Sequence, residues 1–131
     1  TGLVCWLLGI RSPEHLHAHP LRGPIFETWV VSEVLKHQTN QGMRSGLSFY
    51  RDKDGVEADL VIELGRELIV IEAKAAQTAS ARLFAGADRL RGLLATEDNT
   101  VTSRVVYGGA ESQIRSKISL VAWNRLHEDL P

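Results

Sequence analysis

The spacing of hydrophobic residues predicts helices and strands in succession along the chain. Apolar residues three and four positions apart predict two long helices, and a short apolar run predicts a helix that opens the chain. Apolar runs bounded by turn-forming residues predict the strands. The predicted helices span residues 3–8, 23–37 and about 80–94, and the predicted strands span residues 47–51, 56–64, 67–73, 104–107 and 118–121. This order predicts an α/β or α+β domain in which helices pack on a sheet.

Three polar segments separate these elements and are predicted to be connectors. They span residues 11–20, 39–46 and 97–102. In the first of them, the run from Ser12 to Glu14 is able to start a short helical turn.

The second and third strands form a predicted hairpin that gathers charged residues at its far end. A two-residue loop at residues 65–66, with glycine supplying a positive φ, would pair the strands closely. In that register Asp59 lies opposite Glu72, and Glu57 lies opposite Lys74. Because side chains alternate along a strand, we expect all four on one face of an otherwise apolar hairpin.

This group of side chains has two interpretations. Carboxylates on neighbouring strands, Asp59 and Glu72, form an oxygen-rich pocket suited to Mg²⁺ or Mn²⁺, which would activate water on a phosphodiester. Lys74 would then orient the water or stabilise the developing oxyanion. The alternative is structural: a cross-strand ion pair between Glu57 and Lys74 at the edge of the sheet.

Glu27 adds a carboxylate from the long helix that precedes the hairpin. Val30, Val31 and Val34 follow Glu27 by three, four and seven residues, so the carboxylate shares an apolar helix face. Such a group points either into a site or at a buried partner. A buried glutamate favoured by its place near the helix N-terminus is the alternative.

Composition and charge exclude several classes of protein. The 131 residues are 44% hydrophobic and 24% charged, which excludes a disordered, collagenous or coiled-coil chain. The 15 Lys and Arg nearly balance the 16 Asp and Glu, giving a net charge of −1. The chain as a whole is therefore not a basic nucleic-acid binder, and contact with DNA or RNA requires a local patch or a larger assembly.

The first residues bear on location and completeness. Cys5 is the only cysteine, which excludes a disulfide framework and fits a reducing cytoplasm; we predict that it lies in the core. The apolar run over residues 3–10 is too short to span a membrane, and no basic segment precedes it. Because the chain begins at Thr1 without a methionine, we expect a domain from a longer protein.

Several other residues carry weaker signals. His15, His17 and His19 alternate as a zinc site could, but a solvated connector is favoured. The tryptophans are predicted to pack in the core or against a domain outside this chain: Trp6, Trp29 and Trp123. Arg82, Arg89 and Arg91 form either a basic rim for a nucleic-acid backbone or an ordinary solvated helix face. Gln77 either contacts a substrate phosphate or, as favoured, is a polar residue at the entry to a helix.

The order of the helix glutamate, the strand aspartate and the Glu-Ala-Lys motif resembles the PD-(D/E)xK nuclease superfamily, which has the restriction-endonuclease-like fold. A closer resemblance is to the family called domain of unknown function 4143. The segments that carry it span nearly the whole chain: TGLVCWLLGI, GPIFETWVVSEVLK, FYRDKDGVEADLVIE, IVIEAKA and VVYGG. Ala58 stands where the superfamily motif commonly has proline.

The resemblance implies a mixed central sheet flanked by helices. It implies Asp59 and Glu72 as metal ligands, with the Ala73 carbonyl as a third. Lys74 would take the place of the catalytic lysine, and Glu27 would match a helix acid of some branches. It also implies an AAA-type ATPase domain on the N-terminal side, although this chain has no phosphate-binding GxxxxGK[ST] loop itself.

Two hypotheses follow from the sequence. The first is a nuclease-like domain that uses Mg²⁺ or Mn²⁺ to hydrolyse phosphodiesters of nucleic acid, with DNA as the candidate partner. The second is a non-catalytic accessory module that binds nucleic acid or a protein partner for the ATPase domain.

Overall fold

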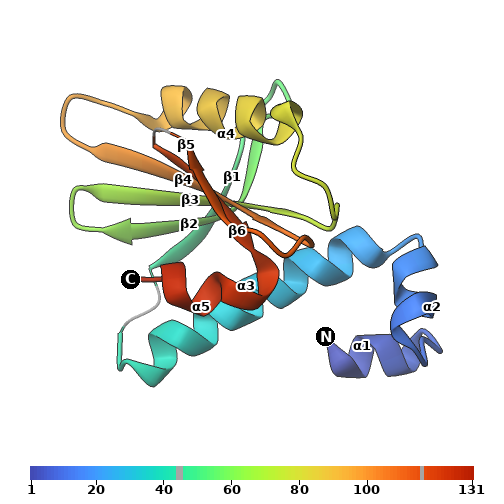
Figure 1. The fold of residues 1–131 in the computed structure, drawn as a ribbon. Helices are drawn as coiled ribbons and strands as arrows, with labels where there is room; N and C mark the ends of the chain where they lie inside the picture. Colours follow the sequence, from blue (N-terminus) through green and yellow to red (C-terminus); the bar gives the residue numbers. More distant parts are fainter. Residues whose placement is uncertain (44–45, 116) are drawn as a thin grey trace.

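A single mixed β-sheet forms the centre of the domain (Figure 1). The computed structural model describes residues 1–43, 46–115 and 117–131. Its strands are β1 Leu47–Arg51, β2 Glu57–Leu64, β3 Glu67–Lys74, β4 Thr100–Tyr107, β5 Gln113–Arg115 and β6 Ile118–Ala122. Within these residues the sheet order is β1-β2-β3-β4-β6-β5. β1, β2 and β3 are antiparallel neighbours, β3, β4 and β6 are parallel, and β5 is antiparallel to β6.

Helices cover both faces of this sheet, as an α/β domain requires. The helices are α1 Gly2–Leu7, α2 Pro13–Ala18, α3 Arg22–Asn40, α4 Ala81–Leu94, the short 3₁₀ helix η1 Trp123–Arg125 and α5 Leu126–Asp129. Figure 1 shows α4 over one face, α3 and α5 over the other, and α1 and α2 beyond the sheet near the start of α3. No helix in the described part of the chain is both long and apolar enough to cross a membrane.

The hydrophobic core has two layers, one on each side of the sheet. On the α3 side, Val30 and Val34 pack on Leu60, Ile62, Ile69, Ile71 and Val106. On the α4 side, Ala87 and Leu90 belong to two clusters that include Val61, Val70, Val101, Val105 and Leu120. Both faces of β2 and β3 are therefore covered, which agrees with the apolar character predicted for both faces of the hairpin.

Most predicted elements are confirmed, with differences at their ends. α3 continues one turn beyond the predicted residue 37. The connector at residues 11–20 is largely α2, which begins where the Ser12 side chain accepts a hydrogen bond from the His15 N–H at 3.2 Å. β5, η1 and α5 were not predicted. Of the predicted loop at residues 39–46, residues 44–45 lie outside the described residues.

The predicted loop at residues 97–102 is shorter than expected because β4 begins at Thr100. Thr100 pairs with Glu67 at the start of the parallel β3–β4 ladder. Ser103 is buried in this added segment, where its hydroxyl donates to the Ala87 carbonyl of α4 at 3.1 Å. A helix carbonyl thus accepts the hydrogen bond of this buried serine. Because serine is polar, the hydrophobic pattern did not predict that the strand includes it.

The predicted hairpin register is confirmed from Leu64–Glu67 to Leu60–Ile71. Gly65 has a φ of +63°, the positive value expected in the two-residue loop.

Two glycines bring the end of β4 against the chain that leaves β3. A Cβ on Gly108 would lie 3.0 Å from the Ala75 carbonyl oxygen. A Cβ on Gly109 would lie 2.7 Å from the Gln77 carbonyl oxygen and 2.2 Å from the ring of Tyr107, which is buried. The VVYGG segment therefore requires glycine at these positions, because any side chain would separate the two strand ends.

We predict that Gly109→Ala lowers the free energy of unfolding by about 1–3 kcal/mol, because the added methyl group overpacks a buried contact. Gly92→Ala is the control, since a Cβ there has no neighbour within 4 Å and the residue lies in α4. Alanine favours a helix, so this control should be neutral or stabilising by up to about 1 kcal/mol. Urea unfolding of both variants measures the difference, and equal stability of the two would contradict the prediction.

Candidate active site at the open end of the β2–β3 hairpin

A β-bulge in β2 lies next to the predicted site. Ser48 of β1 pairs with Val61, whereas Tyr50 pairs with Ala58, so two β2 residues, Asp59 and Leu60, lie opposite one β1 residue. Ala58 accordingly packs in the cluster on the α4 side and not with Leu60 on the α3 side. The expectation that strict alternation holds through residues 57–61 is wrong, because the bulge changes which face each side chain takes.

Asp59 replaces the backbone pairing that the bulge interrupts. The paired β2–β3 residues end at Leu60–Ile71, and beyond them Asp59 Oδ2 accepts a hydrogen bond from the Ala73 N–H at 2.7 Å. The N–H and C=O of one strand residue point to the same edge of the strand. The Ala73 carbonyl therefore also faces β2, beside the Asp59 carboxylate.

Glu72 and Lys74 form an ion pair on the same end of β3. Lys74 Nζ lies 2.9 Å from Glu72 Oε1, and the two side chains are 39% and 17% exposed. A Cβ on Gly86 of α4 would lie 3.5 Å from Glu72 Oε2, so the carboxylate points towards α4. A side chain at Gly86 of α4 would therefore lie at van der Waals distance from this carboxylate.

Glu27 of α3 belongs to the same electrostatic group. Burial raises the pKa of Glu27, the charges of Asp59 and Glu57 raise it further, and Lys74 opposes them. Burial lowers the pKa of Lys74, but the hydrogen bond and charge of Glu72, followed by the charges of Asp59 and Glu27, outweigh burial and raise it overall. The positive charge of Lys74 is thus shared among three carboxylates.

The structural alternative for the hairpin, an ion pair between Glu57 and Lys74, is wrong. Glu57 instead lies 3.6 Å from the guanidinium of Arg51 on β1, and both side chains are more than half exposed. Lys74 is paired with Glu72 on its own strand. Glu57 therefore lies at the rim, although its charge still acts on Glu27, and Lys74 interacts with Glu72, Asp59 and Glu27.

The oxygen atoms at this end of the hairpin suit a hard divalent cation. Within the described residues, no group of three or more His, Cys, Asp and Glu side chains is arranged so that it could hold a metal ion. The available donors are therefore two carboxylates and a backbone carbonyl. One oxygen of Asp59 and one of Glu72 are held by protein groups. Their second oxygens and the Ala73 carbonyl would be the ligands, and this set fits Mg²⁺ or Mn²⁺ with water completing the coordination.

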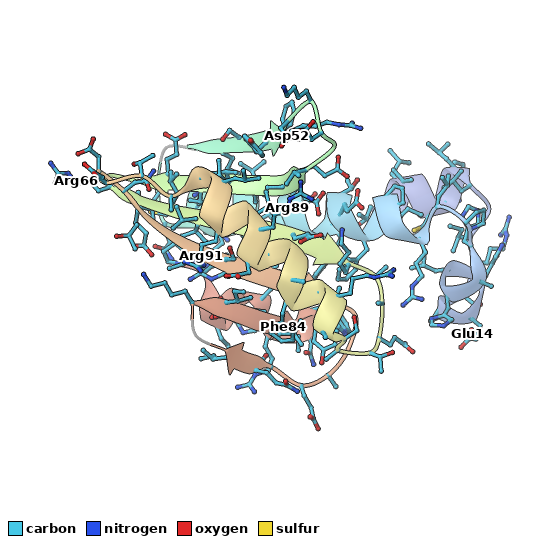
Figure 2. All side chains as sticks on the ribbon, turned by 90° about the horizontal axis from the view of Figure 1, so that it is seen from above. Glu14, Asp52, Arg66, Phe84, Arg89 and Arg91 are labelled. Atoms are coloured by element: carbon cyan, nitrogen blue, oxygen red, sulfur yellow. The ribbon has the colours of Figure 1, made fainter. Side chains whose placement is uncertain are left out.

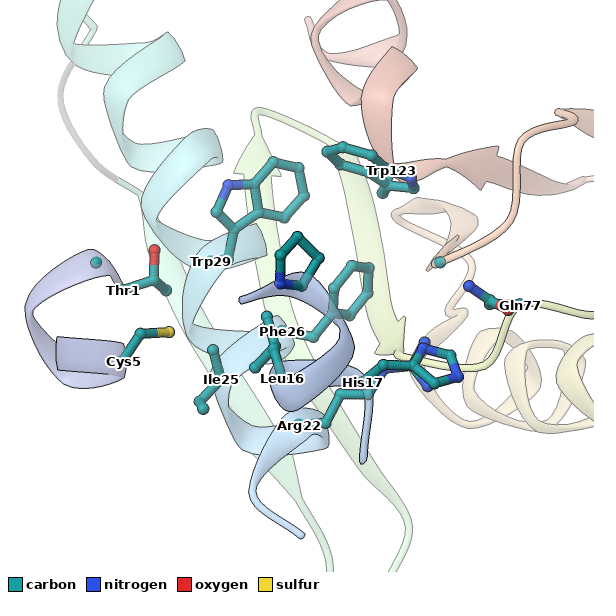
Figure 3. A pocket seen from close by; sticks show the side chains of 13 residues that line it. Thr1, Cys5, Leu16, His17, Arg22, Ile25, Phe26, Trp29, Gln77 and Trp123 are labelled. Atoms are coloured by element: carbon teal, nitrogen blue, oxygen red, sulfur yellow. The ribbon is translucent and has the colours of Figure 1, made fainter. Parts of the chain in front are cut away.

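A cavity that the sequence did not predict lies beside this site (Figure 3). It has a volume of about 490 Å³ and lies among α1, α2, the start of α3 and the segments after β3, β4 and β6. Aromatic rings from distant parts of the chain line it: Phe26, Trp29 and Trp123. No sequence pattern joins these residues, because only the parallel strand order brings Trp123 next to α3.

Arg22 lines the cavity and also contacts the chain segment that leaves the candidate site. Its guanidinium donates a hydrogen bond to the Ala75 carbonyl, directly after Lys74. Gln77 and Gly108, which follow β3 and β4, line the same cavity. The cavity therefore opens at the carboxyl ends of parallel strands, where α/β sheets commonly bind ligands.

The weaker candidates have mixed outcomes. Cys5 is half-buried and lines the cavity, so its placement in the core is wrong; α1 contains no buried residue. His15 and His17 lie in α2, and His19 caps its end. Trp6 is 72% exposed, so it does not pack in the core, and its packing against a domain outside this chain stays a prediction.

Among the arginines of α4, Arg82 and Arg89 are exposed and Arg91 is half-buried; Figure 2 shows Arg89 and Arg91 along this helix. Arg91 pairs with Asp88 at 2.7 Å, whereas Arg82 and Arg89 are exposed and have no ion-pair partner among the described residues. Two of the three predicted rim arginines are therefore available to an anionic ligand.

Residues 22–126 match the family described as Domain of unknown function (DUF4143). The chain belongs to this family. The matched residues of the DUF4143 domain include α3, the whole sheet and every residue of the candidate site. None of the curated proteins compared with the chain matches it.

We predict that Glu27→Gln makes the DUF4143 domain more stable at pH 7. The folded-state pKa of Glu27 lies above its ordinary value of 4.5, so the folded state binds the proton more tightly than the unfolded state. Stability of the wild type therefore falls as the pH rises from 4.5 through the folded pKa, and glutamine removes this loss. Urea unfolding between pH 4 and pH 8 should show the advantage of the variant growing over that range.

Glu33→Gln on the same helix is the control for this prediction. Glu33 accepts a hydrogen bond from exposed Lys36 at 2.7 Å, so its removal should give no gain at pH 7. A Glu27→Gln variant that is less stable than the wild type by the same amount at every pH would contradict the prediction.

Proposed function

We propose that this domain is a metal-dependent nuclease-like domain of the PD-(D/E)xK superfamily, with a restriction-endonuclease-like core, that hydrolyses phosphodiesters of nucleic acid. The observation that supports it best is the opening of the β2–β3 ladder at Asp59. There a free carboxylate oxygen, the Ala73 carbonyl and the Glu72 carboxylate lie beside a lysine. A buried hairpin whose backbone pairing stops before a group of carboxylates is suited to binding a cation, because buried charges need an opposite charge nearby.

Each residue has a separate role in this proposal. Asp59, Glu72 and the Ala73 carbonyl would hold Mg²⁺ or Mn²⁺, which when bound lowers the pKa of a water molecule and offsets charge on a phosphate. Lys74 keeps its proton well above neutral pH, because surrounding carboxylates raise its pKa. It therefore serves as a positive charge that orients water or stabilises an oxyanion. Glu27, which binds a proton more readily than an ordinary glutamate, would accept one from water.

The nucleic acid would lie along the open edge between the hairpin end and α4. Arg82 and Arg89 of α4 are exposed and have no ion-pair partners among the described residues, so they are available to phosphate groups. Counterion release from such contacts makes affinity fall as salt rises. The near-zero net charge of the chain is compatible with this arrangement, because the contacts are local.

A second candidate function is an accessory module that binds nucleic acid or a protein partner without cleavage, for an ATPase domain on the N-terminal side. The observation that favours it is the ion pair between Glu72 and Lys74 at 2.9 Å, which neutralises one ligand carboxylate without a metal. This module would fold without a divalent cation and would bind without turnover.

We predict that Asp59→Asn and Lys74→Met each reduce Mg²⁺- or Mn²⁺-dependent cleavage of DNA by about a hundredfold or more. Asparagine retains an oxygen that accepts the Ala73 N–H, so the first variant should stay folded. Supercoiled, linear and single-stranded DNA, and RNA, are the substrates. Asp88→Asn is the control, because Asp88 lies on the outside of α4 and contacts Arg91. Equal activity in the wild type and in Asp59→Asn would point to contamination and contradict the nuclease proposal.

We also predict that Mn²⁺ at about ten times its dissociation constant raises the melting temperature by about 3–6 °C, because a ligand stabilises the state it binds. The shift should disappear with EDTA and in Asp59→Asn, and should persist in Asp88→Asn. A wild type without any shift and without cleavage, which still binds nucleic acid, would favour the accessory module.

A further inference from the structure

The cavity beside the candidate site has the dimensions and lining of a binding pocket. Its volume of about 490 Å³ lies within the range of small-ligand pockets, and a single nucleobase fits inside it. Its walls come from α1, α2, α3 and the segments after three parallel strands (Figure 3). It is distinct from the carboxylate group, because none of the residues that line it is Asp or Glu within the described residues.

Aromatic rings give the cavity a stacking surface. Phe26 and Trp29 are stacked with centroids 5.8 Å apart and planes at 27°, and Trp123 meets Trp29 edge-on at 5.7 Å. Trp123 is 45% exposed, so its ring is accessible to a ligand as well as to Trp29. Planar aromatic ligands stack on such rings, and every nucleobase has the required face.

Polar groups are few and lie at the side of the cavity that faces the strand ends. Figure 3 places Gln77 and His17 on this side. The side-chain amide of Gln77 is exposed and offers both a donor and an acceptor to the edge of a base. Arg22 uses one N–H to hold the Ala75 carbonyl and has further N–H groups for a phosphate.

The chain segment that follows β3 connects the candidate site to the cavity. Ala75, which Arg22 holds, directly follows Lys74, and Gln77 lies two residues further along the chain. Arg22 therefore connects the chain segment that follows Lys74 to the wall of the cavity, and a strand bound at Lys74 would have to follow this segment for its next nucleotide to reach the cavity. A base inside a duplex is stacked on its neighbours and cannot enter, whereas a base in a single strand or overhang can.

We propose that this cavity binds an unpaired nucleobase of the strand whose phosphate lies at Lys74. The base stacks on Trp123, and Gln77 contacts its edge. This inference rests on the proposed function, and it makes single-stranded or overhanging nucleic acid the preferred substrate class.

The test measures binding in EDTA, so that it does not depend on cleavage. A fluorescein-labelled twelve-nucleotide oligothymidylate is titrated with the chain at low salt, and anisotropy gives the dissociation constant. Trp123→Ala should weaken binding about fivefold to a hundredfold, the usual effect of removing one base-stacking ring. Trp6→Ala is the matched control, because Trp6 is also an exposed tryptophan but does not line the cavity. It should bind as the wild type does.

Two further variants guard against misfolding of Trp123→Ala. Trp123→Phe retains a ring and should recover most of the affinity, and Gln77→Ala, at an exposed position, should weaken binding without loss of stability. A blunt duplex of the same length should bind more weakly and should not distinguish Trp123→Ala from Trp6→Ala.

The outcomes separate this inference from the proposed function. Equal affinity of Trp123→Ala, Gln77→Ala and Trp6→Ala would overturn the base-binding cavity, even if the wild type cleaves DNA. Binding of blunt duplex with the same dependence on Trp123 would also overturn it. Loss of single-strand binding in Trp123→Ala and Gln77→Ala, with recovery in Trp123→Phe, would support it, even if no variant or wild type shows cleavage.

Discussion

The hydrogen bond from the Ala73 N–H to the Asp59 carboxylate is the contact on which the candidate site depends. Ala73 is 1% exposed, and a buried N–H without an acceptor costs about 1–3 kcal/mol. In a regular hairpin, a backbone carbonyl of β2 would accept this bond, but Ala58 pairs with Tyr50 on the other side. The Asp59 side chain takes its place, so the bulge in β2 persists and the ladder stays open where the carboxylates gather.

The open hairpin end and the cavity occupy the same edge of the sheet because of the strand order. β3, β4 and β6 are parallel, so the segments that leave them emerge together. Gly109 allows the chain after β4 to approach Gln77, and Arg22 holds Ala75 against the start of α3. A change at either contact would therefore move both the residue after Lys74 and the wall of the cavity.

The sequence was sufficient to predict the structure where contacts between neighbouring residues determine it. It was insufficient where pairing with a strand distant in the sequence changes it. The loop with Gly65 set the register of β2 and β3, and the prediction holds as far as Leu60. It fails at Asp59, because pairing with β1 introduces a bulge that no property of the hairpin reveals. The cavity was not predictable for a similar reason, since Trp123 reaches α3 only through the parallel order of the sheet. The candidate residues could be named from the sequence, but the faces they occupy could not.

Although the net charge of the chain is only −1, two neighbouring regions differ in the charge of the ligand that they favour. Around Glu27 the electrostatic balance is negative: burial is the largest cause of its raised pKa, and beyond burial the charge of Asp59 raises the pKa more than the charge of Lys74 lowers it. A cation would be favoured there. The cavity has the opposite character, because Arg22 and His17 line it and no acidic residue does, among those described. With a cation at the negative region, a ligand that carries a phosphate at its edge and an aromatic ring beyond it would contact both regions at once. A nucleotide has this chemistry, and a phosphate or an aromatic compound alone would satisfy only one of them.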